Sequence, residues 1–134
     1  MNRFYESVAH VLEVDSVGFD TEFRKVSGWC SLHAFGLLVM LENDFAAPMD
    51  IAALGSMHTV GDLYVHAFAA LVAAIVGCRA DELTADSAAG DTPGWDSVNH
   101  LRIFMEAEKR FDVRYDLAEM PAVRTIADFV RAGR

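Results

Sequence analysis

Hydrophobic positions recur at three- and four-residue intervals along most of the chain, and this spacing predicts helices. The clearest case spans Ser31 to Phe45, where the apolar residues expected to share a face are Leu32, Phe35, Leu38, Val39, Leu41 and Phe45. The stretch from Phe4 to Val14 has the same pattern, with Phe4, Val8, Val11 and Leu12 on one face. The sequence shows no strand-like alternation. These patterns predict an all-α protein.

The same periodicity predicts further helices, separated by loops that carry glycine or proline. In the second half we expect helices over Phe68–Val76, Ser97–Phe111 and Thr125–Ala132, a loop over Gly77–Gly94 and a short turn over Leu117–Met120. In the first half, a loop over 15–30 and a short segment over Asp50–Leu54 precede a helix that starts near Thr59. Thr59 is a suitable N-cap, and an acid at Asp62 favours the positive end of that helix.

One segment of the sequence occurs twice: Gly28-Trp29-Cys30-Ser31-Leu32 recurs 66 positions later as Gly94-Trp95-Asp96-Ser97-Val98. The same displacement, without a gap, pairs Asp15 with Asp81, Asp20 with Asp86, Glu42 with Glu108, Phe45 with Phe111, Ala52 with Ala118, Thr59 with Thr125 and Asp62 with Asp128. A fixed period indicates two copies of one small domain. We therefore expect residues 1–66 and 67–134 to form two tandem four-helix bundles, each with three long helices and one short helix.

The junction between the copies carries no helix-breaking residue. From Asp62 to Val76 neither Gly nor Pro occurs, and Ala, Leu and Val predominate. Helix propensity is high on average in such a segment. We expect one continuous helix to join the copies and to orient them rigidly. The alternative is a kink near His66, because Val65 and His66 are weaker helix formers.

The overall charge narrows the classes of partner. The chain of 134 residues has a formal net charge of −9, so nucleic acid and anionic membrane surfaces are poor partners and basic protein surfaces are good ones. Residues 1–66 carry three Lys/Arg and nine Asp/Glu, whereas residues 67–134 carry eight and eleven. The first copy is therefore the more acidic one.

Cysteine usage and hydropathy favour a soluble cytoplasmic protein. Cys30 and Cys78 do not occupy equivalent positions in the repeat, and the sequence has neither a CxxC motif nor a His/Cys cluster. A disulfide framework or a metal site is therefore not indicated. The apolar run Ala67–Val76 is too short to span a bilayer, and no signal sequence is recognisable at the start. We expect no membrane insertion.

Ser31 and Ser97 are the residues of chemical interest that occupy the same place in both copies. Each follows a long loop and opens a helix, where free backbone N–H groups and the helix dipole favour an anion. A phosphodiester on such a hydroxyl would be stabilised electrostatically. The simpler interpretation is that Asp96-Ser97 is an ordinary N-cap, because Asp and Ser are preferred caps.

The surrounding motifs resemble those of the acyl carrier protein family. Its domains have an Asp-Ser-Leu-type motif that opens the second helix, a Glu-x-x-Phe that ends it, and a Thr-Val/Ile-x-Asp that opens the last helix. The second copy offers Asp96-Ser97-Val98, Glu108-Lys109-Arg110-Phe111 and Thr125-Ile126-Ala127-Asp128. The first copy offers Ser31-Leu32, Glu42-Asn43-Asp44-Phe45 and Thr59-Val60-Gly61-Asp62. Each motif alone is weakly specific, but their order is the same in both halves.

The resemblance implies a carrier protein rather than an enzyme. In that family a phosphopantetheinyl transferase joins the 4′-phosphopantetheine arm of coenzyme A to the serine, and the thiol of the arm carries acyl groups as thioesters. Ser97 and Ser31 would be the attachment sites, and Asp96 would be the acid that precedes the serine. The expected partners are the transferase and acyl-loading or acyl-transfer enzymes, such as ketosynthases or acyl-ligases, of fatty-acid or polyketide-type biosynthesis.

The first copy departs from this pattern, because Cys30 replaces the acid. Cysteine is a poor cap, so the start of the helix is expected to be less stable by about 0.5–2 kcal/mol. Ser31 could itself take the capping role, and a transferase that reads the acid would miss this copy. Two hypotheses remain for Ser31: an altered but functional site, or a degenerate site retained for its fold.

Other residues have structural interpretations. Trp29 and Trp95 are expected to cover the loop against the core, with a docking role as the alternative. The histidines lack metal-ligand spacing and are expected on solvated faces; they are His10, His33, His58, His66 and His100. Apart from the distant Lys25, no cation flanks Cys30 in sequence, so an activated thiol is not indicated.

Two other functions remain as alternatives. Gly-Trp-x-Ser does not fix the cargo, so an aminoacyl or peptidyl carrier of a nonribosomal pathway is one. A helical interaction scaffold that is never modified is the other. A serine-nucleophile enzyme is poorly supported, because the repeat supplies no histidine base at matching positions. The helices after Ser31 and Ser97 also differ in charge, which predicts partially different partners for the two copies.

Overall fold

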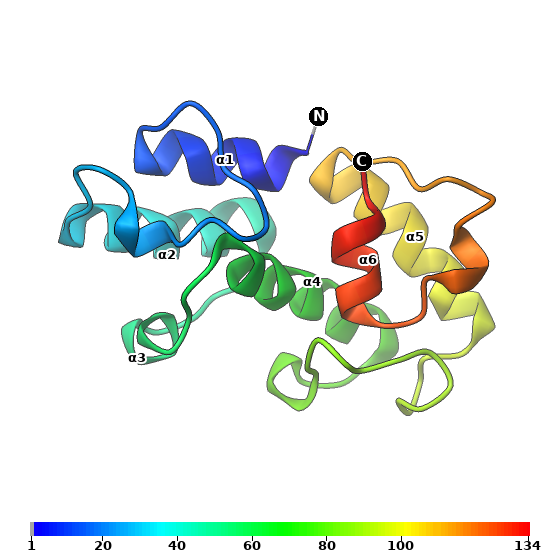
Figure 1. Cartoon of the computed structure of the whole chain (residues 1–134). Helices are drawn as coiled ribbons and strands as arrows, with labels where there is room; N and C mark the ends of the chain where they lie inside the picture. Colours follow the sequence, from blue (N-terminus) through cyan, green and yellow to red (C-terminus); the bar gives the residue numbers. More distant parts are fainter. Residues whose placement is uncertain (1) are drawn as a thin grey trace.

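The chain folds into α-helices joined by loops (Figure 1). A computed structural model describes residues 2–134. The α-helices are α1 (Arg3–Leu12), α2 (Ser31–Phe45), α3 (Ile51–Gly55), α4 (Val60–Val76), α5 (Ser97–Phe111) and α6 (Ile126–Ala132). Short 3₁₀ turns cover Phe23–Lys25 (η1), Ala80–Glu82 (η2) and Met120–Ala122 (η3). Within residues 2–134 there is no strand, so the expected all-α class is confirmed.

Helix α4 crosses the centre of the molecule and joins the two halves of the sequence. It runs unbroken through His66 and ends at Gly77, whose φ of 86° gives the left-handed C-cap conformation. Its start is closed by a capping box: Thr59 Oγ1 accepts the N–H of Asp62 at 3.1 Å, and the Asp62 carboxylate accepts the N–H of Thr59 at 3.0 Å. The expected continuous helix is therefore confirmed. In Figure 1, α1, α2 and α3 lie to one side of α4, and α5 and α6 to the other.

The bounds of α2 and α5 and the starts of α4 and α6 repeat with the 66-residue period of the sequence. Helices α2 and α5 begin at equivalent serines and end at equivalent phenylalanines. A residue in the left-handed conformation follows each of them, Ala46 with φ 51° and Asp112 with φ 52°. The capping box of α4 has its counterpart at the start of α6, between Thr125 and Asp128. The backbone therefore follows the sequence repeat at α2 and α5 and at the starts of α4 and α6.

The loops that precede the two serines are anchored in the same way. The N–H of Val60 donates to the carbonyl of Thr21 at 2.8 Å, and the equivalent N–H of Ile126 donates to the carbonyl of Ser87 at 3.1 Å. Two isolated bridges, Glu22 with Thr59 and Ala88 with Thr125, are equivalent as well. Each loop is thus fixed to the start of α4 or α6, which limits where the following Gly-Trp-x-Ser segment can lie.

The two halves of the chain share one hydrophobic core. Aromatic rings from α1, α2, α4 and α5 pack on one another across the repeat, namely Phe4, Phe45, Tyr64, Phe68 and Phe111. The expected boundary at residues 66 and 67 lies inside α4. Separate tandem bundles over 1–66 and 67–134 therefore stay a prediction.

The buried face of α2 differs from the one that its spacing suggested. Leu37, Met40 and Leu41 are buried, whereas Leu32 and Phe35 are 78% and 66% exposed. Nearly every position in the first three turns of α2 is apolar, so periodicity alone does not orient this helix. Within residues 2–134, no helix combines the length and apolar character needed to cross a bilayer.

Candidate functional site

Ser97 and Ser31 occupy the first positions of α5 and α2, and both are exposed. The residue before each serine has extended backbone and serves as the N-cap, Asp96 in one case and Cys30 in the other. Ser31 therefore does not take the capping role. Since α2 and α5 lie on opposite sides of α4, the two serines belong to separate surfaces of the molecule (Figure 1).

The start of α5 is held by two hydrogen bonds across the Gly-Trp-Asp-Ser segment. The carboxylate of Asp96 accepts the N–H of Asn99 at 2.8 Å, which satisfies one of the free donors in the first helical turn. The side-chain amide of Asn99 donates to the carbonyl of Gly94 at 2.7 Å. Asp96 therefore acts as the cap that its sequence position predicts, and it leaves the Ser97 hydroxyl free to face solvent.

Trp95, within this segment, is buried and forms a hydrogen bond with His100. The indole is 1% exposed, and its N–H donates to Nδ1 of His100 at 2.9 Å. The opposite ring nitrogen of His100, Nε2, donates to the carbonyl of Val123 at 3.0 Å. Burial lowers the pKa of His100, and the charge of Arg124 adds to this effect. His100 is therefore a neutral bridge between α5 and the segment before α6, and the expectation of a solvated histidine was wrong here.

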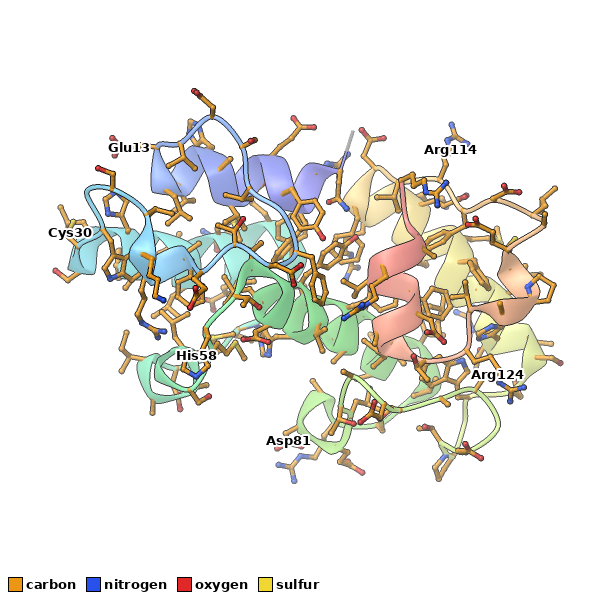
Figure 2. The ribbon with its side chains drawn as sticks, in the orientation of Figure 1. Glu13, Cys30, His58, Asp81, Arg114 and Arg124 are labelled. Atoms are coloured by element: carbon orange, nitrogen blue, oxygen red, sulfur yellow. The ribbon has the colours of Figure 1, made fainter. Side chains whose placement is uncertain are left out.

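A pocket of about 340 Å³ opens beside Ser97. It is lined by Ala89, Gly90, Trp95, Asp96, Ser97, His100, Met120, Pro121 and Arg124. Figure 2 labels Arg124, which projects from the segment that precedes α6. The pocket thus joins the serine to a mostly apolar hollow with one cation at its edge.

The first copy has an arginine where the second copy has Gly90. The guanidinium of Arg24 donates to the carbonyls of Leu54 and Met57. Leu54 is equivalent to Met120, which lines the pocket in the second copy. Met57 is equivalent to Val123, whose carbonyl accepts a hydrogen bond from His100. Arg24 therefore ties η1 to α3 and to the segment that follows it, a contact that Gly90 cannot make in the second copy.

The start of α2 also has its own contacts. The N–H of Cys30 donates to Nδ1 of His33 at 3.1 Å, and the Cys30 thiol lies 3.4 Å from the same nitrogen. The ring of His33 stacks on Trp29 with centroids 5.9 Å apart. The side chain of His33 therefore accepts a hydrogen bond at the start of this helix. A histidine three residues after a cysteine is not a capping pattern that the sequence alone would indicate.

Large apolar side chains that remain exposed follow the same repeat. Within residues 2–134 they form four equivalent pairs: Leu32 with Val98, Phe35 with Leu101, Val39 with Met105, and Ile51 with Leu117. Three members of each set lie on the helix that follows the serine. We call these two sets the serine-helix stripes. Their positions, three or four residues apart, place these three members of each set on one face of the helix.

Charges around the two stripes differ in sign. Helix α5 carries Arg102, Lys109 and Arg110 beside Glu106 and Glu108, whereas the charged residues of α2 are Glu42 and Asp44 near its end. Among the described residues no group of three or more His, Cys, Asp or Glu side chains is placed to hold a metal ion.

No protein-family model matches the chain, and it matches neither a curated protein nor a solved structure.

Proposed function

We propose that this chain is a tandem acyl carrier protein, in which Ser97 and Ser31 accept 4′-phosphopantetheine from coenzyme A. Acyl groups are then carried as thioesters on the thiol of the arm. One observation carries the proposal: equivalent serines stand exposed at the first position of two helices with identical repeat boundaries. A helix start with free N–H groups stabilises the phosphodiester that would form there.

The surroundings of Ser97 suit a modification that an external enzyme performs. Asp96 is occupied by its cap to Asn99, and the nearest histidine, His100, is engaged by Trp95 and Val123. Within residues 2–134, no hydrogen bond joins either side chain to the Ser97 hydroxyl. A transferase would supply the activation, and this chain would supply an accessible hydroxyl and a rigid helix start.

The pocket beside Ser97 supports a carrier role for the second copy. Its volume of about 340 Å³ suits part of an arm or a short acyl chain. The guanidinium of Arg124 at its edge favours the phosphate end of the arm. In the first copy, Arg24 occupies the equivalent region, so we expect Ser31 to hold its cargo more openly.

The serine-helix stripes supply the surface on which partner enzymes would dock. The exposed apolar side chains on the helix after each serine would bury apolar area when a partner approaches the arm; they are Leu32, Phe35 and Val39 on α2 and Val98, Leu101 and Met105 on α5. The net charge of −9 favours partners with basic rims. Since α2 and α5 carry different charges, partially different partners are expected for the two copies.

The decisive experiment is the intact mass of the purified protein after incubation with coenzyme A and a broad-specificity phosphopantetheinyl transferase. Wild type, Ser31→Ala, Ser97→Ala and the double variant are compared. We expect two added arms on the wild type, one on each single variant and none on the double variant. One arm on wild type that disappears with Ser97→Ala identifies Ser31 as a degenerate site.

Addition of the arm distinguishes a carrier protein from a scaffold that is never modified. The kind of group loaded onto the arm distinguishes an acyl carrier from an aminoacyl or peptidyl carrier. No added mass on wild type, with circular dichroism showing folded protein, would replace the proposal by the scaffold. If arms are added, incubation with acyl-activating and aminoacyl-activating enzymes shows which cargo is accepted. Preferential loading with amino acids would favour the nonribosomal alternative.

A further inference from the structure

Three side chains at the start of α2 form a chain of contacts that the repeat does not share. The Cys30 thiol lies 3.4 Å from Nδ1 of His33, and Nε2 of His33 lies 3.8 Å from a carboxylate oxygen of Glu13. Cys30 and Glu13 are exposed, while the side chain of His33 is 13% exposed. Figure 2 labels Glu13 and Cys30 at the same end of the molecule, beyond the ends of α1 and α2.

The contacts fix the orientation and the tautomer of the imidazole. Nδ1 accepts the backbone N–H of Cys30 at 3.1 Å, so it carries no proton, and the Cys30 sulfur lies 3.4 Å from the same nitrogen. The proton of the neutral ring is therefore on Nε2, which faces Glu13. Trp29 stacks on the other side and holds the ring in place. A thiol, an imidazole and a carboxylate thus follow one another in space, the carboxylate at 3.8 Å contributing its charge rather than a hydrogen bond.

The corresponding residues of the second copy cannot do the same chemistry. The residues at the equivalent positions are Asp96 for Cys30, Asn99 for His33 and Arg79 for Glu13. Asp96 and Asn99 form an ordinary cap, and Arg79 is paired with Asp81. All three members of the Cys30, His33 and Glu13 cluster are therefore particular to the first copy, where the usual acid of the serine motif is missing.

We propose that Cys30 is a second, arm-independent acyl-accepting site, which takes acyl groups from thioesters with His33 as base and Glu13 as its orienting group. The choice of thioesters as substrate rests on the proposed carrier function, since an arm on Ser31 would bring a thioester next to Cys30. Thioester exchange also needs no oxidant or reductant, and a thiol is a suitable nucleophile for it.

The step is a transthioesterification. The hydrogen bond from the Cys30 backbone N–H to His33 Nδ1 breaks, and this nitrogen takes the thiol proton as the sulfur of Cys30 attacks the carbonyl carbon of the donor thioester. The N–H groups of Ser31 and Leu32, the first two of α2, have no carbonyl partner within the helix and stabilise the oxyanion. The carbon–sulfur bond to the donor then breaks, and the departing thiolate recovers the proton from His33. Cys30 ends as a thioester, the donor ends as a free thiol, and no net charge is gained or lost.

The test uses the full chain with both serines replaced, Ser31→Ala/Ser97→Ala, so that no arm is present. The protein is incubated with acetyl-coenzyme A and without a transferase. We expect one hydroxylamine-sensitive acetyl group on Cys30 by intact mass and peptide mapping, and its loss in a Cys30→Ser variant. We expect His33→Gln to slow this acetylation roughly tenfold, while His10→Gln, an exposed histidine on α1, leaves it unchanged.

Cys78 provides an internal reference in the same molecule. Burial raises the pKa of its thiol, and Glu82 adds to this. We expect iodoacetamide to alkylate Cys30 at least several-fold faster than Cys78 in the wild type, and circular dichroism to show that His33→Gln is folded. Equal rates at the two cysteines, no acetyl group on Cys30, or an unchanged rate in His33→Gln would overturn the assignment. Because none of these measurements uses a transferase, any of these results leaves arm attachment to be judged by the mass experiment above.

Discussion

Phe45 and Phe111, the last residues of α2 and α5, stack on each other with ring centroids 5.5 Å apart and planes inclined by 17°. They are equivalent residues of the repeat, and both are fully buried. Phe4 packs on Phe45 at 5.1 Å, and Phe68 on Phe111 at 5.6 Å. The two copies are therefore joined by a shared aromatic contact as well as by α4, which favours cooperative unfolding of the whole chain.

Replacing either ring of this stack is expected to destabilise the whole molecule. Phe45→Leu and Phe111→Leu should each lower the free energy of unfolding by about 1–3 kcal/mol, because each leaves a partly filled cavity. The double variant should show a coupling of roughly 0.5–1.5 kcal/mol, since the two rings touch. Urea denaturation followed by circular dichroism measures both quantities.

Phe35→Leu is the matched control, because Phe35 lies exposed on α2 and its replacement should change stability by less than about 0.5 kcal/mol. Two separate unfolding transitions, each shifted by only one of the core variants, would show that the halves fold independently.

Gly28 and Gly94 test how tightly the two serine loops are packed. Both adopt a left-handed φ, 84° and 85°, which costs a side-chain residue about 1–2 kcal/mol. An added Cβ at Gly28 meets no neighbouring atom within 4 Å, whereas at Gly94 it would collide with the carbonyl oxygen of Val76. We therefore expect Gly94→Ala to cost about 1–3 kcal/mol more than Gly28→Ala.

The comparison of Gly28→Ala with Gly94→Ala is made by thermal and urea unfolding. Equal losses of stability would mean that the loop moves away from the end of α4 at no cost. In that case, Trp95 fluorescence should also change in Gly94→Ala, because Trp95 is the next residue.

The repeat made most helix positions predictable from the sequence. The bounds of α2 and α5 agree with expectation residue for residue, and the Thr59 cap and the unbroken α4 are as expected. These features depend on local signals, namely caps, the absence of helix breakers, and glycines at positive φ. Helix α1 ends two residues earlier than expected, where Glu13 turns into the left-handed conformation.

Contacts between segments distant in sequence could not be predicted in this way. The direction of the buried face of α2 depends on the shared aromatic core, and Phe45 meets Phe111 only in the folded chain. The contacts of His100 with Val123 and of His33 with Glu13 likewise join segments that are far apart in the sequence. The two serines and Asp96 could be located from motifs alone, whereas the pocket beside Ser97 required the position of Arg124 and Met120.

Restoring the missing acid of the first copy should strengthen its helix start. In Cys30→Asp, the carboxylate can accept an N–H of the first turn of α2, as Asp96 does for α5 at 2.8 Å. We expect the variant to be more stable by about 0.5–2 kcal/mol, measured by urea denaturation. If the transferase reads this acid, arm addition to Ser31 should also become several-fold faster in a Ser97→Ala background.

Asp96→Cys is the reciprocal control and should weaken α5 and slow arm addition to Ser97. Unchanged stability in Cys30→Asp would mean that the contact between the Cys30 N–H and His33 already caps α2 as well as a carboxylate does.

The serine-helix stripes should act separately for the two copies. Leu32 and Val98 are exposed and directly follow the two serines, so a charge at either position should leave stability within about 0.5 kcal/mol. We expect Leu32→Asp to slow arm addition to Ser31 at least tenfold and leave Ser97 unaffected, with the reverse for Val98→Asp. Time-resolved intact mass with single-serine variants measures each rate, and equal slowing at both serines would contradict separate docking surfaces.

The bridge made by His100 predicts a loss of stability in mild acid. Burial lowers the pKa of His100 below its ordinary value of 6.5, so the unfolded chain binds a proton before the folded chain does. Well above pH 6.5 the ring is neutral in both states and adds no pH dependence. Below it, protonation of the unfolded state lowers stability progressively as the pH falls. A protonated ring would also lose the lone pair that accepts the Trp95 N–H at 2.9 Å.

His100→Gln separates this effect from the other histidines, because a glutamine amide can accept from Trp95 and donate to Val123 without titrating. We expect the wild type to lose more unfolding free energy than His100→Gln between pH 7 and pH 5, and His10→Gln to follow the wild type. Near-ultraviolet circular dichroism of the buried Trp95 should weaken over the same range in the wild type. Parallel pH profiles for the wild type and His100→Gln would mean that the folded protein accommodates the charged ring without loss.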